Sequence, residues 1–307
     1  MEDYLEKILE FLPETFFDKD SDDFIKYLSD AFIENSTNEK YQFAFTAFHM
    51  LNMVFIYKTK WFLFKQGNTI ICTALENFRN NKNNNIDEFN TLFDLSLFNE
   101  KKSVEEVLKS LKFHVNEIGI SRNHVDVRNN CSHASGRIYY DSQKKIEHFI
   151  EEELLVIERI HVKTLEMMES LINKFINEKW NNTFILQDIK ILFNENYFSK
   201  KDLLSILNFQ YSFLSLKSNT SEVFYKKILY LLIVNEIQIR VNSDENFFLQ
   251  KLPFLMNNIS ENIIVKKEVD ELEISTLEII EEHISPIIST FFNEEREKAE
   301  EILYSNC

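Results

Sequence analysis

The scarcity of glycine and proline constrains this chain more than any other feature of its sequence. Only three glycines and three prolines occur among 307 residues. Tight hairpins and phosphate-cradling loops depend on glycine, and proline is the other common residue of sharp turns. The sequence therefore predicts an all-α protein of long helices joined by polar loops. It also lacks the Gly-x-Gly-x-x-Gly and Gly-x4-Gly-Lys patterns of nucleotide-binding folds.

Apolar periodicity and capping signals divide the chain into a series of expected helices. Their approximate ranges are 3–12, 21–34, 38–65, 68–80, 86–98, 103–119, 142–178, 186–194, 200–216, 221–241, 244–257 and 274–303. The helix of about 38–65 is rich in aromatic residues and is expected to form the centre of the first core. Capping boxes at 36–39 and 103–106 are expected to open the helices that follow them, and Gly119 is expected to close the second. The segment Ser199-Lys200-Lys201-Asp202 is likewise expected to start the helix of about 200–216.

An asparagine-rich segment at 180–183 suggests a boundary between two helical domains, 1–180 and 181–307. The second domain ends in an acidic stretch, because twelve Asp and Glu residues lie between Glu268 and Glu301 against one arginine and one lysine. Such a charge run is typical of a solvated helix face. The sequence suggests no specific role for this domain.

Charge and cysteine content narrow the compartment and the partners. The formal net charge of −16 argues against a protein that coats nucleic acid, although a small local basic cleft stays compatible with it. Three widely spaced cysteines and an acidic N-terminus favour the reducing cytoplasm. The apolar run 43–57 is short for a membrane span and contains His49 and Asn52, so a buried core helix is expected there.

One stretch, Val127 to Gly136, combines groups that can act on a phosphodiester. Arg128 offers a planar fork of donors for a phosphate, and His133 can move a proton near neutral pH. Asn129 has an amide that can orient either of them. These are the groups that a metal-free ribonuclease needs.

In this motif, and in its helical context, the chain resembles the HEPN superfamily, whose ribonucleases carry Arg-polar-x3–5-His in a small helical domain. Here the pattern reads Arg128-Asn129-x3-His133, and the resemblance covers residues 1 to about 180. It implies a metal-independent endoribonuclease without a cofactor, which leaves 2′,3′-cyclic phosphate and 5′-hydroxyl ends. It further implies that His133 moves the proton, Arg128 stabilises the phosphorane and Asn129 orients one of them. Such domains commonly act as toxins or anti-phage effectors, so the resemblance also implies a neutralising antitoxin or regulatory partner.

The surroundings of the motif suggest how RNA could be held. Between Ser121 and His148 the charge balance turns positive, and the candidate RNA-binding residues there are Arg122, Arg137, Lys144 and Lys145. On one regular helix Arg128 and His133 would point about 140° apart. Each could then reach a different side of a groove shared by two copies, so a homodimer is expected.

Other potential sites are weaker. Glu158-x-x-His161 and His148-x-x-Glu151 have the spacing of di-metal carboxylate proteins, but no second such pair has apolar flanks, so no metal site is expected. Cys131 is interpreted as a small packing residue, and His49 as a hydrogen-bonded core histidine.

Two alternative functions stay open at this stage. The motif could be structural, in a non-catalytic helical interaction module whose acidic surface binds a partner. The chain could also be a regulatory subunit for a nucleotidyltransferase or an ATPase.

Overall fold

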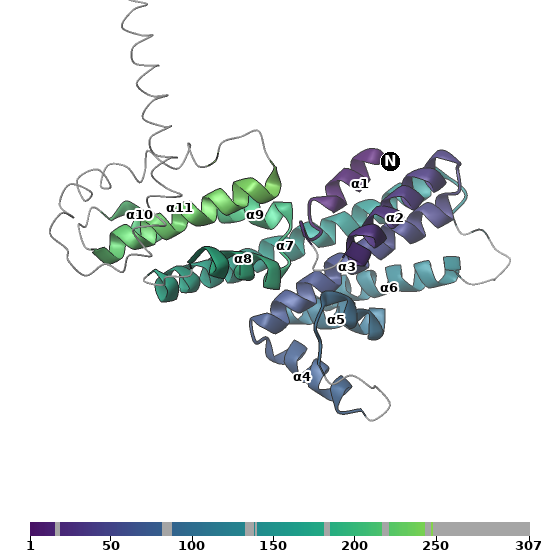
Figure 1. The fold of residues 1–307 in the computed structure, drawn as a ribbon. Coiled ribbons are helices and arrows are strands. Elements are labelled where there is room, and N and C mark those ends of the chain that lie inside the picture. The colour runs from purple at the N-terminus through teal and green to yellow at the C-terminus, as the bar shows by residue number, and fades with distance from the viewer. Residues whose placement is uncertain are drawn as a thin grey trace, which may run out of the picture. The chain divides into compact units, whose positions relative to one another are not determined.

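The computed structural model is helical almost throughout the part of the chain that it describes (Figure 1). The described residues are 1–15, 19–81, 88–132, 138, 140–180, 185–216, 221–242 and 247. Within these ranges Pro13 and Ser199 form an isolated antiparallel β-bridge. The expected all-α class is therefore confirmed.

Eleven α-helices and one 3-10 helix occur in the described ranges. They are α1 (Glu2–Leu9), α2 (Lys19–Thr37), α3 (Tyr41–Lys65), α4 (Thr69–Arg79), η1 (Leu92–Leu97), α5 (Glu100–Ser110), α6 (Val115–Ser132), α7 (Gln143–Lys179), α8 (Ile185–Asn196), α9 (Lys200–Ile206), α10 (Ser212–Ser215) and α11 (Ser221–Val241).

Helix α3 is the centre of the first core, as its aromatic content predicts. It packs against α2, α5, α6 and η1. Phe45, Phe48 and Phe55 on this helix are at most 2% exposed. Burying each such side chain contributes about 1.5–3 kcal/mol, so a helix apolar on all sides is stable only when it is surrounded.

Two of the predicted capping boxes are wrong. Ser36 lies in the last turn of α2 and donates its hydroxyl to the Phe32 carbonyl at 2.7 Å, while Glu39 adopts a left-handed φ of 58° that separates α2 from α3. Ser103 is fully buried inside α5, which begins three residues earlier with Asn99 as its N-cap. In both cases a hydroxyl finds a different partner from the one that the local pattern suggests.

The segment between α5 and the motif also differs from the prediction. A turn with a left-handed Lys112 (φ 56°) ends α5, and Gly119 lies inside the next helix, α6, rather than at a helix end. The helix expected at 86–98 is instead the short η1, capped by Thr91 and Asp94. Likewise the helix expected at 200–216 is divided into α9 and α10.

The chain forms two compact units. The first comprises Met1–Ile172 and Lys190–Phe209, and the second comprises Asn173–Ile189 and Gln210–Cys307. The expected division into two independent domains, 1–180 and 181–307, stays a prediction. The helices expected at 244–257 and 274–303, with their acidic stretch, lie outside the described residues apart from Phe247.

In the second unit, α11 supplies most of the described core. Tyr230, Leu231 and Ile233 on this helix are at most 1% exposed. Tyr211 and Phe213 stack at 5.5 Å, and both ring edges meet Tyr230. No described helix is both long and apolar enough to cross a membrane.

Candidate functional site

Arg128 and Asn129 lie in the last turns of α6, where they line an open surface depression of about 410 Å³. The other walls are the end of η1 and the first turn of α5. They include Ser96, Asn99 and Lys101. The depression is therefore polar, and it has the size of a small-molecule or nucleotide subsite.

Within the depression Arg128 is ion-paired with Glu100, the first residue of α5. The Arg128 side chain is 16% exposed and that of Glu100 is 29% exposed. Burial lowers the pKa of the Arg128 guanidinium, and Tyr57 and Glu153 nearby act in the opposite direction. An arginine stays protonated under such conditions, so this wall carries a fixed cation that is ion-paired with the Glu100 carboxylate.

His133 and Arg137 lie outside the described residues, which resume at Ile138 and Tyr140. The spatial arrangement of the complete motif therefore stays a prediction.

The flanking basic residues are mostly engaged by acidic neighbours. Arg122 pairs with Glu105 at 3.2 Å, and Lys145 pairs with Asp141 at 2.6 Å on an exposed helix start. Lys144 is exposed. None of these three lines the depression, so any RNA contact from them would extend beyond it.

A buried cluster of histidines and carboxylates lies between α3, α6 and α7. His49 contacts the Glu153 carboxylate through Nδ1, which confirms that it is a hydrogen-bonded core histidine. His124 contacts Glu152 at 3.0 Å through Nε2 and approaches Glu153 at 3.8 Å through Nδ1. Sequence reasoning found no partner for His124, because its partners are 28 and 29 residues away and no local pattern joins them.

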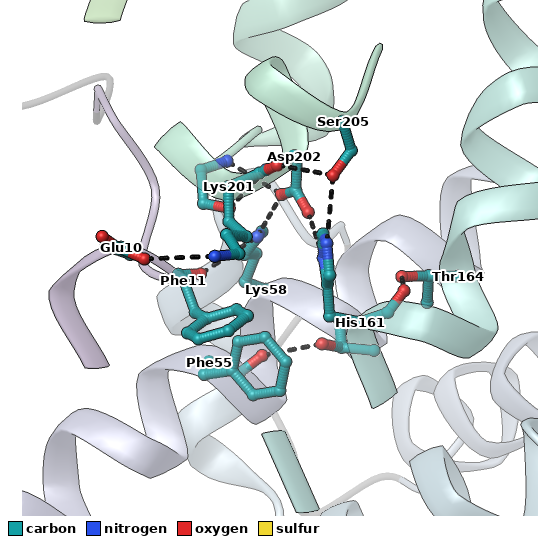
Figure 2. Close-up of polar contacts among 11 residues, drawn as sticks. Glu10, Phe11, Phe55, Lys58, His161, Thr164, Lys201, Asp202 and Ser205 are labelled. Atoms are coloured by element: carbon teal, nitrogen blue, oxygen red, sulfur yellow. Dashed lines mark hydrogen bonds and ion pairs between the residues drawn. The ribbon is translucent and has the colours of Figure 1, made fainter. Parts of the chain in front are cut away.

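A second buried cluster joins four segments of the first unit (Figure 2). The Asp202 carboxylate accepts hydrogen bonds from Lys58 and from His161 Nδ1, the latter at 3.0 Å. Lys58 also donates to the Phe11 carbonyl at 3.0 Å. The cluster therefore ties α3, α7, α9 and the turn after α1 together.

The capping box at Ser199 positions this cluster. As predicted, Ser199 opens α9, and its hydroxyl accepts from the Asp202 backbone N–H at 3.2 Å while Asp202 accepts from the Ser199 N–H at 2.9 Å. Burial alone would raise the pKa of Asp202, but Lys58 and His161 outweigh it and hold that pKa well below its usual range. Burial lowers the pKa of Lys58, even though Asp202 favours its charged form.

The order Asp202, His161, Ser205 follows that of a catalytic triad, and His161 Nε2 lies 3.2 Å from the Ser205 hydroxyl. However, the single proton of the Ser205 hydroxyl is donated to the Lys201 carbonyl at 2.8 Å and not to His161, so Ser205 is not arranged as an activated nucleophile. The cavity beside the cluster leaves only about 10 Å³ for the centre of a water-sized sphere, and Ser205 is not on its walls. This arrangement is structural.

The other alternative sites also have structural explanations. His161, half of a possible di-metal spacing, is engaged by Asp202 and Ser205, and His148 is 68% exposed at its side chain. Among the described residues no group of three metal-ligating side chains has metal-binding geometry. Cys131 is 4% exposed, and burial raises the pKa of its thiol to about 11, which suits the predicted packing role.

Comparison with known proteins gives no match to a family model, to a curated protein or to a solved structure.

Proposed function

We propose that this chain is a metal-independent endoribonuclease whose substrate phosphate binds in the depression beside Arg128 and Asn129. One observation carries the proposal: two of the three motif residues line one open, polar depression on the surface. The third, His133, follows Asn129 by four residues. A substrate phosphate bound at Arg128 would therefore be only five residues along the chain from His133, the proposed proton carrier.

The chemistry follows from the charges involved. The ribose 2′-oxygen attacks the adjacent phosphorus while the bond from phosphorus to the 5′-oxygen breaks, which leaves a 2′,3′-cyclic phosphate and a 5′-hydroxyl. His133 moves the proton between these oxygens, and Arg128 stabilises the extra negative charge of the phosphorane. Asn129 orients one of these groups. No step requires a metal ion.

The Glu100 carboxylate would compete with a substrate phosphate for Arg128. A phosphate must displace Glu100 from Arg128 before it can receive the guanidinium fork. The exchange replaces one anion by another, so its cost is modest at a partly solvated site. Lys101 on the same wall is paired with Asp126 and can contribute in the same way.

The partners are part of the proposal. The active unit is a homodimer in the cytoplasm, in which each copy contributes its arginine and histidine to a shared groove. As the resemblance implies for a toxin or anti-phage effector, an antitoxin or regulatory protein would restrain the activity.

The rival candidate is a non-catalytic helical interaction module, and the Glu100–Arg128 pair favours it. In this alternative, the sole role of the largely buried Arg128 is to join α5 to α6 through Glu100. In that case the depression would receive no phosphate, and replacing Arg128 would cost stability rather than activity.

The deciding experiment is incubation of the purified full chain with total RNA in EDTA, followed by mapping of the cut ends. Cyclic-phosphate ends that disappear in Arg128→Ala and His133→Ala support the proposal. Arg159→Ala is the matched control, because Arg159 is a half-exposed arginine ion-paired with Glu117 away from the depression. Intact RNA from a folded wild-type dimer would favour the interaction module.

A further inference from the structure

A small polar cavity lies inside the first unit where α3, α6 and α7 meet. Its polar walls are His49 and Asn52 of α3, Ser121 and His124 of α6, and Glu153 of α7. Its volume is about 10 Å³. That is the room that one water molecule needs, and too little for any larger ligand.

Three buried polar atoms on these walls have no hydrogen-bond partner among the described residues: His49 Nε2, Ser121 Oγ and Glu153 Oε2. Their residues are 1%, 8% and 2% exposed, so bulk solvent does not reach them. Buried polar atoms in proteins are almost always paired, with ordered water as the usual partner where no protein group is available. Three such atoms around one cavity indicate a common ligand.

We infer that the cavity is a specific site for a single ordered water molecule. The hydrogen-bond polarity fits one water completely. With Nδ1 of His49 donating to Glu153 Oε1, the neutral ring offers Nε2 as an acceptor, and Glu153 Oε2 is a second acceptor. The water donates one proton to each of them and accepts the proton of the Ser121 hydroxyl, so all three atoms are satisfied.

A metal ion does not fit this set of groups. His49 Nδ1 and Glu153 Oε1 are already in direct contact, which leaves no space for an ion between them. His124 directs Nε2 to Glu152, and the described residues contain no group of three ligands with metal geometry.

The water would join three helices that the direct contacts join only in part. The direct contact of His49 with Glu153 connects α3 to α7, and that of His124 with Glu152 connects α6 to α7, whereas the Ser121 hydroxyl on α6 has no hydrogen bond to a described residue. Through the water, α6 is held at Ser121, seven residues before Arg128. The site does not depend on the proposed ribonuclease activity.

The test is a crystal structure of the full chain at a resolution that shows ordered water, collected with and without a zinc soak. We expect one peak within hydrogen-bond distance of all three atoms and no anomalous signal. An empty cavity, an anomalous scatterer, or a His49 ring rotated so that Nε2 bonds a protein group would each overturn the inference.

A double-mutant cycle in solution tests the same bridge without a crystal. Ser121→Ala and Glu153→Gln should lower the melting temperature by less together than the sum of their separate effects, because both act on one water. Ser121→Ala should also lower it more than Ser29→Ala, whose half-buried hydroxyl only bonds its own helix at Ile25. Additive effects, or equal effects of the two serine variants, would contradict a shared water.

Discussion

The Arg128 guanidinium on α6 is ion-paired with the Glu100 carboxylate on the first turn of α5, and both residues line the same open depression. This carboxylate occupies part of the surface that an anionic ligand of Arg128 would need. The pair therefore competes directly with any phosphate bound there. Its removal should separate a ligand-binding arginine from one that only joins two helices.

We predict that Glu100→Gln strengthens RNA binding. Freeing Arg128 from a partly solvated pair should be worth about 0.5–1 kcal/mol, which is roughly 2- to 5-fold in the dissociation constant. Fluorescence anisotropy with a short RNA at fixed salt measures it, using His133→Ala as the background to prevent cleavage. Glu117→Gln is the matched control, since Glu117 is ion-paired with Arg159 outside the depression, and neither is a candidate RNA contact. Weaker or unchanged binding in Glu100→Gln would show that Arg128 is not the phosphate contact.

Asp202 should make the stability of the first unit depend on acidic pH. Its folded-state pKa is depressed, so its stabilising contribution is complete above the unfolded-state pKa of about 3.9 and is lost as pH falls below that value toward the folded pKa. We expect Asp202→Asn to cost about 3–5 kcal/mol at pH 7, because Lys58 is then buried without its carboxylate.

Urea unfolding of both proteins between pH 7 and pH 3 measures this difference. The gap between wild type and Asp202→Asn should narrow below about pH 4. Asp141→Asn is the control, because Asp141 is exposed and pairs with Lys145 on the surface, and it should change stability little at any pH. A gap of constant size down to pH 3 would contradict the assigned pKa depression.

Lys60 is a second buried cation, and its ion-pair partner is Glu106. Its amine is fully buried, lies 2.7 Å from Glu106 and 3.8 Å from the centre of the Phe98 ring. Glu106→Leu alone should cost about 3–5 kcal/mol in the free energy of unfolding, because it leaves a buried cation. The double variant Lys60→Met/Glu106→Leu should recover most of that loss, since an apolar pair of similar size needs no charge. Equal losses in the single and double variants would refute this account.

The cysteines should differ in reactivity. Because burial raises the pKa of the Cys131 thiol to about 11, only about one molecule in a thousand carries the thiolate at pH 8. Cys72 is only partly buried. In a Cys307→Ser background, iodoacetamide followed by peptide mass mapping should label Cys72 well before Cys131. Rapid labelling of Cys131 in the folded chain would contradict its packing role.

Sequence reasoning succeeded where the deciding physics is local. Residues close together in the sequence decide three correctly predicted features. These are the apolar run of α3, the long periodic pattern of α7 and the capping box of Ser199 and Asp202. It failed at Ser103, because that hydroxyl faces Lys60 from across the core rather than the start of its own helix. The local pattern is the same in both boxes, and only tertiary burial distinguishes them.

The candidate site was predictable to a similar extent. Arg128 and Asn129 stand out by residue type, and both do line a depression. Glu100 could not be identified, since it lies 28 residues earlier and pairs with Arg128 only through the packing of α5 on α6. Lys58 and Asp202 are 144 residues apart for the same reason. Long-range charge pairs leave no periodic trace in a sequence.

The last prediction concerns the shared site of the proposed homodimer. Each copy offers one fixed cation, Arg128, and one proton carrier, His133, and in-line transfer benefits from groups on both sides of the phosphorus. Sedimentation at micromolar concentration should give about twice the chain mass of 36.7 kDa. Dilution through the dissociation constant should then lower the activity per chain.

Complementation distinguishes a site shared between copies from one complete in each copy. Arg128→Ala and His133→Ala should each be inactive alone. If the groove combines Arg128 of one copy with His133 of the other, mixing and re-equilibrating the two variants creates heterodimers in which one of two sites is intact. Random pairing should then restore about a quarter of the wild-type activity. If the two groups act within one chain, every mixed dimer lacks an intact site and the mixture stays inactive, even when sedimentation shows a dimer.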